Sequence, residues 1–190
     1  DSGKTADTHN RISIAEEAKL TREFILTQTK LADIVYYLDS NHDDFLIKFL
    51  DNRNGWIKDS KNYQTCIDLE SARAKGRRPI IELLGLDTIP KLKYIHTTDK
   101  LFINGIFTCH GHRGVRGSRP NFKALAKVYN FYNQNHTHVP GVFRNAVCGG
   151  LNGRKDMSYN DHTSGWLTAN TAIHEDGSQQ LIPIIDGLWR

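Results

Sequence analysis

The chain is poor in cysteine, and its three cysteines lie far apart. Cys66, Cys109 and Cys148 are an odd and sparse set among 190 residues, which argues against a disulfide scaffold and suits a reducing compartment such as the cytoplasm. No two of them form a C-x-x-C pair, so a zinc site built from thiolates is not expected.

Long apolar segments are also lacking. No apolar run approaches the roughly 20 residues that cross a bilayer, and residues 1–10 are too polar for a signal peptide. No repeat, low-complexity tract or internal linker stands out either. We therefore expect a protein that does not enter a membrane, with one domain spanning residues 1–190.

Charge of one sign is only slightly in excess. Lys and Arg total 25 against 21 for Asp and Glu, which gives a net charge of +4. A mildly basic chain can bind a polyanion such as nucleic acid but is equally typical of an ordinary enzyme. The basic group Lys75, Arg77 and Arg78 is interpreted as a solvated surface.

Hydrophobic periodicity and turn signals predict a chain in which strands, polar clusters and helices alternate, with a β-rich end. Ser13 and Glu16 form a capping-box pattern at the start of the first helix. Such an order predicts a layered α/β architecture with function at the strand ends. The expected helices are 13–32, a segment around 45–50, 63–74, 79–84 and 120–129; the expected strands are 34–38, 91–96, 101–109 as a hairpin, 131–135, 145–148, 166–173 and 181–185.

Histidine is the unusual residue, because there are nine and several occur in tight pairs. Three polar clusters each follow an apolar strand: Asn41-His42-Asp43, His110-Gly111-His112 and His136-Thr137-His138. A single histidine is more often a surface residue than a metal ligand. Three such clusters at three strand ends are much harder to attribute to chance, and alternate residues of H-x-H can share one metal site.

This series resembles the later motifs of calcineurin-like metallophosphoesterases, whose pattern runs D-x-H, G-D, G-N-H-D/E, a histidine often in H-G-H, and G-H-x-H. The resemblance covers roughly Ile34 to Leu151, and the helix-rich stretch after Asp44 is similar to phage-encoded members. It implies a layered α/β-sandwich fold with mixed sheets flanked by helices. It also implies a location in the host cytoplasm if the protein is phage-encoded.

The chain departs from the family pattern in two respects. Ser40 and Asn135 replace the family's glycines directly before Asn41 and directly before His136, positions that shape a turn and bind no metal. The first two motifs are not evident, because Asp7-Thr8-His9 spells D-x-H without a preceding apolar strand. We therefore expect the N-terminal strands to be absent, the chain to be a fragment of a longer protein, and metal to bind poorly without the upstream segment.

The resemblance assigns metal ligands residue by residue. Asn41 would bind the second metal through its side-chain carbonyl, and His110 and His136 would complete the ligands that this chain gives to that metal. His138 would bind the first metal. The cofactor is two divalent ions, with Mn²⁺ favoured and Mg²⁺, Fe, Zn²⁺ or Ni²⁺ as alternatives, because imidazole and amide oxygen suit these metals.

Catalytic and substrate roles follow from the same resemblance. His42 would stabilise transition-state charge on the phosphate or protonate the leaving oxygen, and Asp43 would orient His42. Arg113 and Arg116, with Arg119, could hold substrate phosphates, because guanidinium forks match phosphate oxygens. A solvated loop is an equally good interpretation of these arginines.

Aromatic and glycine residues near these clusters could serve either in packing or in binding. Tyr129, Phe131 and Tyr132 could stack on nucleobases, although a core role is favoured. Gly149-Gly150 resembles the small-residue turn after G-H-x-H and would let the backbone approach the site, while a plain tight turn explains it equally well.

The resulting hypothesis is an enzyme that hydrolyses phosphodiesters by a two-metal mechanism, with DNA as the favoured substrate. Two alternatives remain open. One is an inactive metallophosphoesterase scaffold that binds protein or nucleic acid, and the other is a phosphatase acting on phosphoproteins or nucleotides.

Overall fold

A computed structural model describes residues 12–118, 120–152 and 165–189. The chain divides into two compact units, one formed by Asp1–Tyr37 and Asn41–Tyr94 and the other by Leu38–Ser40 and Ile95–Arg190. Each unit is described by itself, and the expectation of one domain stays a prediction. No helix of the described ranges is long and apolar enough to cross a membrane.

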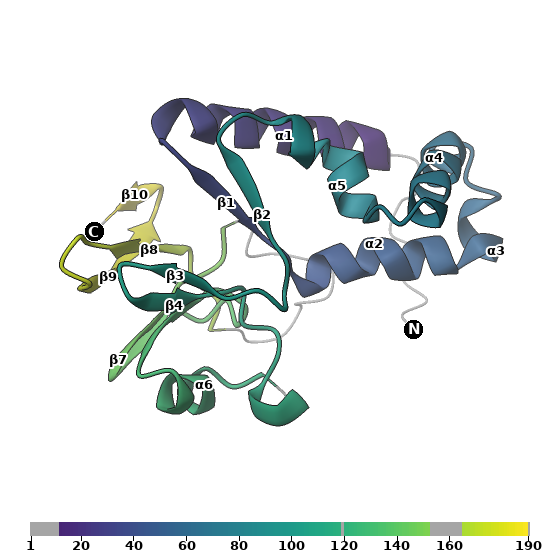
Figure 1. Ribbon diagram of the computed structural model, residues 1–190. Coiled ribbons are helices and arrows are strands. Elements are labelled where there is room, and N and C mark those ends of the chain that lie inside the picture. The colour runs from purple at the N-terminus through teal and green to yellow at the C-terminus, as the bar shows by residue number, and fades with distance from the viewer. Residues whose placement is uncertain (1–11, 119, 153–164, 190) are drawn as a thin grey trace. The chain divides into compact units, whose positions relative to one another are not determined.

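The first unit is mainly helical (Figure 1). Its elements include one two-stranded sheet, in which Val35 N–H donates to Lys91 O and Asp39 N–H to Ile95 O, each at 2.9 Å. In both bonds the donor and the acceptor are separated by the same number of residues, which shows that the two strands run parallel. The elements are α1 (Ile14–Leu31), β1 (Val35–Leu38), α2 (Asn41–Asp51), α3 (Arg53–Trp56), α4 (Tyr63–Ala74), α5 (Pro79–Leu84), η2 (Leu86–Thr88) and β2 (Leu92–Ile95).

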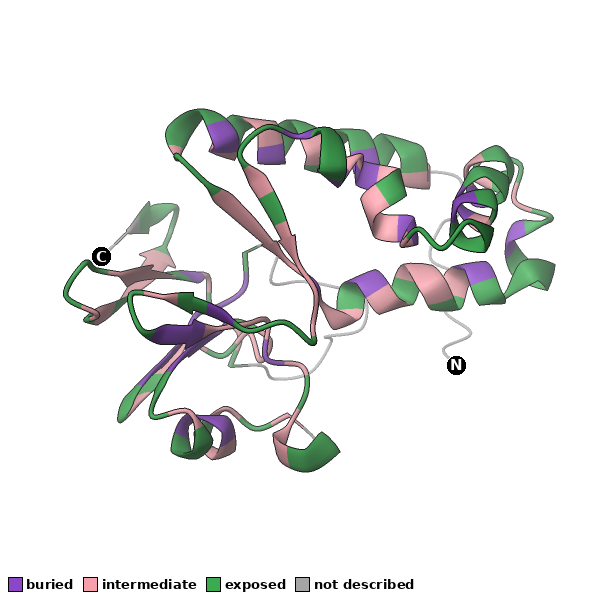
Figure 2. Cartoon of the chain, viewed as in Figure 1, coloured by how far each residue is buried: buried purple, intermediate pink, exposed green. Residues whose placement is uncertain are grey.

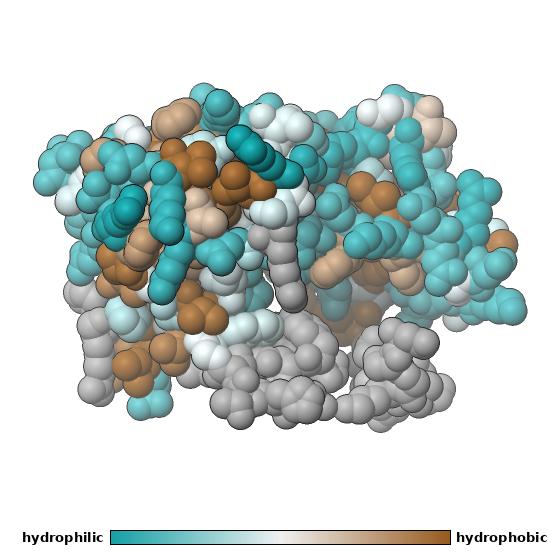
Figure 3. Space-filling model, turned by 90° about the horizontal axis from the view of Figure 1, so that it is seen from below, coloured by the Kyte–Doolittle hydropathy of each residue, from teal (hydrophilic) through white to brown (hydrophobic). Residues whose placement is uncertain are grey.

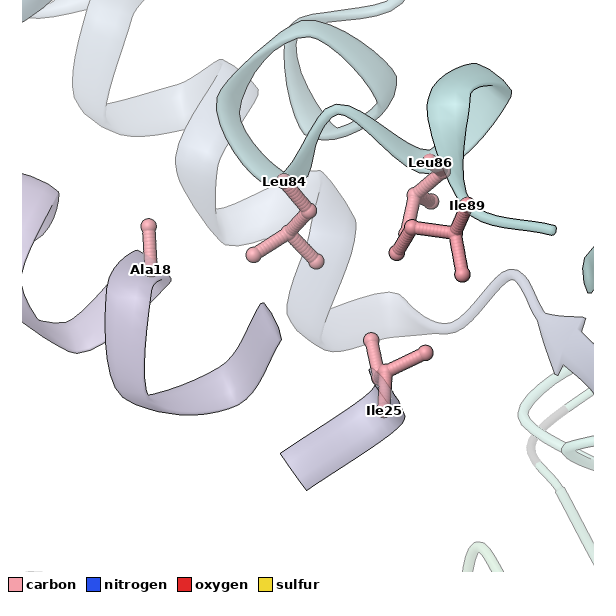
Figure 4. Close-up of a cluster of buried hydrophobic side chains, with 5 residues drawn as sticks. All are labelled: Ala18, Ile25, Leu84, Leu86 and Ile89. Atoms are coloured by element: carbon pink, nitrogen blue, oxygen red, sulfur yellow. The ribbon is translucent and has the colours of Figure 1, made fainter. Parts of the chain in front are cut away.

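Two buried clusters hold the first unit together. In one, side chains from α1, α5 and the segment after α5 point toward one another (Figure 4): Ala18, Ile25, Leu84, Leu86 and Ile89. The other joins α2, α3 and α4 through Leu50, Trp56, Cys66 and Leu69. Only one face of α1 is buried (Figure 2), as its periodicity predicts.

The second unit contains a five-stranded sheet in the order β3-β4-β5-β7-β6 and a three-stranded sheet in the order β10-β9-β8. In the larger sheet the central strands β4, β5 and β7 are parallel, while β3 and β6 are antiparallel edge strands. Its elements are β3 (Leu101–Ile103), β4 (Ile106–Thr108), η3 (Val115–Gly117), α6 (Phe122–Val128), β5 (Phe131–Gln134), β6 (Gly141–Phe143), β7 (Asn145–Cys148), β8 (Ala169–Ile173), β9 (Gln179–Ile185) and β10 (Leu188–Trp189).

Alternation along β5 shows how the layers of this unit are arranged. Tyr132 belongs to the buried cluster that joins the sheet to α6, together with Phe107 and Leu125. The next residue, Asn133, points to the opposite face and donates to Thr171 Oγ1 at 3.0 Å and to Gln179 Oε1 at 3.2 Å. A helix therefore covers one face of the larger sheet and the smaller sheet lies toward the other.

These features confirm a mixed α/β architecture, whereas the metallophosphoesterase sandwich itself stays a prediction. One helix is not among the expected elements, because residues 52–55 look like a break in the sequence whereas Arg53–Trp56 forms a short helix. The reason is the side chain of Trp56, which is buried and donates through Nε1 to Leu50 O at 2.9 Å, so that the segment folds back on α2.

Candidate functional site

The parallel strands of the second unit bring two of the predicted clusters to one edge of the sheet. β4 leads into His110 and β5 leads into His136, and both strands end at the same edge because they are parallel neighbours. The two loops are also joined directly, since His110 O accepts hydrogen bonds from Asn135 N–H at 3.4 Å and from His136 N–H at 3.0 Å. This confirms the expectation that polar clusters gather at strand ends.

Two of the predicted metal ligands face each other at this edge. The His110 Nε2 and His136 Nδ1 atoms are 3.1 Å apart. A nitrogen ligand lies about 2.0–2.1 Å from a bound ion such as Zn²⁺, which puts two nitrogens on one ion about 2.9–3.4 Å apart. The pair therefore fits two ligands of one ion, and the same distance also suits a hydrogen bond between the rings.

A third histidine, which the sequence reasoning did not select as a ligand, joins this pair. The His112 ring centre lies 5.4 Å from that of His110 and 6.2 Å from that of His136. Among the residues that the structure describes, no group of three or more His, Cys, Asp and Glu is arranged to hold a metal ion. The His110–His136 pair thus offers part of a coordination shell.

Gly111 lets the two histidines of H-G-H sit where they do. Its φ is +91°, a conformation that L side chains rarely adopt, and a Cβ on it would collide with the side chain of Gln134. Gln134 is fixed in turn, because its Oε1 accepts the Tyr132 hydroxyl at 2.7 Å. Burial raises the pKa of Tyr132, so that the hydroxyl stays protonated as a donor.

The Gly149-Gly150 pair also allows a close approach of the chain. A Cβ at Gly149 would meet the side chain of Asn135, and one at Gly150 would meet the backbone of Leu167. Gly149 N–H donates to Gln134 O at 2.8 Å and so ties the end of β7 to the end of β5. Tight packing beside the His136 loop, rather than a positive φ, requires these glycines.

His138 has different surroundings from the His110–His136 pair. Its backbone has a φ of +57°, and its ring packs edge-on against Trp166, with 4.7 Å between the ring centres. Its N–H donates to Asn135 O at 3.2 Å and closes the turn that carries His136. A role for His138 as a ligand of the first metal stays a prediction.

Asn41, His42 and Asp43 belong to the first unit, at the start of α2. Asp43 is buried and accepts the Tyr37 hydroxyl at 2.9 Å, while His42 is exposed and lies edge-on to Phe45. Adjacent helical residues point in different directions, so a role for Asp43 in orienting His42 stays a prediction. A metal ion shared by Asn41 and the histidines of the second unit also stays a prediction.

The basic residues fall into two kinds. Lys75 is exposed and the exposed Arg77 is paired with Glu82 at 2.9 Å and with Asp87 at 2.7 Å, as expected of a solvated surface. Arg78 differs, because it is partly buried and its Cζ lies 5.8 Å from the centre of the Tyr94 ring. Arg113 and Arg116 are exposed in the segment after the H-G-H loop. Arg119 lies outside the described residues, as does Asp7-Thr8-His9.

A second acid–imidazole pair, not foreseen from the sequence, lies in the same unit as His110. The buried Asp39 carboxylate is 3.6 Å from His96 Nε2 and accepts Thr97 N–H at 3.4 Å. On the other side of the ring, His96 Nδ1 lies 2.7 Å from Thr98 Oγ1 and accepts Thr98 N–H at 3.3 Å. Both residues end apolar strands, the signal that singled out the three clusters.

Comparison with known proteins finds similarity to a phage protein. The chain is 30% identical over 168 residues to Protein A1 of Escherichia phage T5, a match that covers 79% of this chain and 29% of the phage protein. It supports a phage origin, and the chain spans less than a third of that relative's length. No protein-family model matches the chain, and no solved structure does.

Proposed function

We propose that the chain is part of a metal-dependent phosphodiesterase that hydrolyses DNA by a two-metal mechanism. The observation that carries this proposal is the 3.1 Å approach of His110 Nε2 and His136 Nδ1 at the ends of two parallel strands. A sequence relative in a phage is in keeping with DNA as the substrate.

The proposed division of labour keeps the roles that the resemblance implies. His110 and His136, with Asn41, would hold one divalent ion, and His138 would contribute to the other. Bound ions of this kind supply Lewis acidity toward a phosphoryl oxygen and make a water more acidic. The imidazoles hold their nitrogens in place through the hydrogen bonds that join their loops.

The chain's own side chains would then act on the phosphate. His42, which is exposed at the first turn of α2, would stabilise developing charge or give a proton to the leaving oxygen. Arg113 and Arg116 are exposed, and no acidic partner is seen for them among residues 12–118, 120–152 and 165–189, so they suit the backbone phosphates of a DNA strand.

Hydrolysis of single-stranded DNA and of bis-p-nitrophenyl phosphate with Mn²⁺, by the full-length gene product, tests the proposal. We expect turnover that needs the metal, and a loss of at least about 100-fold in His42→Ala with Mn²⁺ still bound. His174→Ala, which changes an exposed histidine of the β8–β9 hairpin, is the matched control and should keep full activity.

A second candidate is a scaffold that holds protein or nucleic acid without turnover. It is favoured by the observation that, within the described ranges, no group of three or more His, Cys, Asp and Glu is arranged to hold an ion. Absence of turnover with every divalent metal, by folded full-length protein, would reject the enzyme and leave this scaffold. Cleavage of a phosphomonoester but of no diester would point to a phosphatase.

A further inference from the structure

A pocket of about 410 Å³ opens beside the histidine cluster, and all of its walls belong to the second unit. This volume is within the range of small-molecule sites, about 300–1,000 Å³. His110 and His112 are part of its lining. A ligand that fills the pocket would therefore lie next to the proposed phosphate site.

One wall of the pocket is apolar and aromatic. The Phe107 and Tyr129 ring centres are 4.3 Å apart with their planes tilted by 37°, and the ring centre of Tyr132 lies 5.8 Å from that of Tyr129. Leu125 and Val128 of α6 extend this wall, and Val128 is 56% exposed. A flat aromatic ring gains from such a surface through stacking and burial of apolar area.

The remaining lining is polar and unevenly charged. Two kinds of charge line the pocket: the carboxylate of Asp39, whose side chain is 1% exposed and lies next to His96, and the exposed guanidinium groups of Arg113 and Arg116. A buried carboxylate repels a phosphate and accepts from an amino group, as it does from the amino group of cytosine. Arginine forks bind phosphate. The charges thus orient a nucleotide with its base inward and its phosphate at the mouth.

The surface of the molecule mixes hydrophobic and hydrophilic residues. On the face seen from below in Figure 3, hydrophobic residues occur in small patches bordered by hydrophilic ones. A nucleotide has the same division between a flat apolar face and a charged end.

We infer that this pocket binds the base of a nucleotide in the DNA strand, with the ring against the Phe107–Tyr129 wall and the phosphate beside His110 and Arg113. The inference rests on the proposed function for its DNA strand. It adds a binding place for a base. It also implies that Asp39 and His96 contact the base and not the scissile phosphate.

Binding of deoxyadenosine monophosphate to the chain, measured by equilibrium titration without metal, tests the inference. We expect this nucleotide to bind at least about tenfold more tightly than 2-deoxyribose 5-phosphate, since stacking of one base is worth about 1–3 kcal/mol. Equal affinity for the two compounds, or no binding of the nucleotide, would overturn the inference.

A pair of valine variants separates the pocket from the rest of the surface. Val128→Trp fills the pocket mouth and should weaken nucleotide binding at least about tenfold by excluding the stacked base. Val142→Trp places the same side chain on β6, at a valine that is 64% exposed and does not line the pocket, and should bind normally. Equal binding by the two variants would overturn the inference.

Photo-crosslinking provides a readout that needs no variant. An 8-azido derivative of the nucleotide should label a peptide between Phe107 and Tyr132 of the wild-type chain, and labelling elsewhere would contradict the inference. Nucleotide binding without hydrolysis of DNA would reject the nuclease and leave the pocket standing. Hydrolysis of DNA without nucleotide binding would reject the nucleotide pocket and leave the nuclease proposal in place.

Discussion

Gly111 lies between two histidines with a φ of +91°, and the side chain of Gln134 fills the space where a Cβ would be. Gln134 is itself buried and bonded to Tyr132. The position of the H-G-H loop therefore depends on a backbone conformation and on a contact, both of which require glycine.

Gly111→Ala tests this dependence. We expect it to lower the free energy of unfolding by about 1–3 kcal/mol, because the positive φ becomes strained and Gln134 must move. Gly105→Ala is the matched control in the same unit, since Gly105 has a φ of +81° with nothing within 4 Å of its Cβ position. Urea denaturation measures both, and an equal loss in the two variants would show that the contact with Gln134 is unimportant.

At this scale the sequence predicted some contacts and missed others. It brought His110 and His136 together correctly, because both follow strands whose parallel pairing could be expected. It did not predict the place of His112 beside them, since the turn at Gly111 redirects the chain after β4. It also passed over Asp39 and His96, which are far apart in the chain and meet through the pairing of β1 with β2.

Among the elements, α1 has the clearest local reason for where it begins. The Ser13 side chain accepts Glu16 N–H at 3.2 Å, and the Glu16 carboxylate accepts Ser13 N–H at 2.7 Å. This reciprocal pair satisfies two backbone donors at the helix start, so the capping box predicted from the sequence is confirmed.

Ser13→Ala should reduce the free energy of unfolding by about 0.5–2 kcal/mol, because the first turn of α1 loses its cap. Thermal unfolding followed by circular dichroism measures the change. Ser71→Ala, in the interior of α4 and exposed, is the control and should be neutral or slightly stabilising. A loss equal to that of the control would show that the cap contributes nothing.

The cap also has a predictable dependence on pH. Hydrogen bonds from Ser13 lower the pKa of Glu16 below its ordinary value. A lowered folded-state pKa means that the stabilisation is present above the pKa of the unfolded chain and is lost as pH falls through the folded one. Ser13→Ala keeps the bond from the residue 13 N–H to the Glu16 carboxylate and loses the bond from the hydroxyl. The part of the stability difference between wild type and Ser13→Ala that comes from the hydroxyl bond should therefore shrink on acidification.

Most elements could be predicted because their signals are local. The bounds Tyr63–Ala74 and Pro79–Leu84 agree with the expected helices, and the latter has proline at its start and Gly85 in a left-handed conformation at its end. The short edge strand β6 and the helix α3 were not predicted. Both depend on partners distant in the chain or on the burial of one side chain, Trp56.

For the whole molecule, the relation to the phage protein is informative but partial. The matched region is 29% of that relative's length, so activity, substrate and partners are proposals for the chain. Within the described residues, two imidazole nitrogens lie close enough to share an ion, and no group of three or more His, Cys, Asp and Glu is arranged to hold one. We therefore expect the chain alone to bind metal weakly, and the full-length gene product to bind it more tightly.

Titration of the chain with Mn²⁺, followed by the loss of the free-ion signal in electron paramagnetic resonance, is the most direct test of a shared ion at His110 and His136. The account predicts weak but specific binding that falls at least about tenfold in His110→Ala and in His136→Ala, and that is unchanged in His174→Ala. If all three variants bind Mn²⁺ as the wild-type chain does, these two histidines are not ligands and the proposed metal site is wrong.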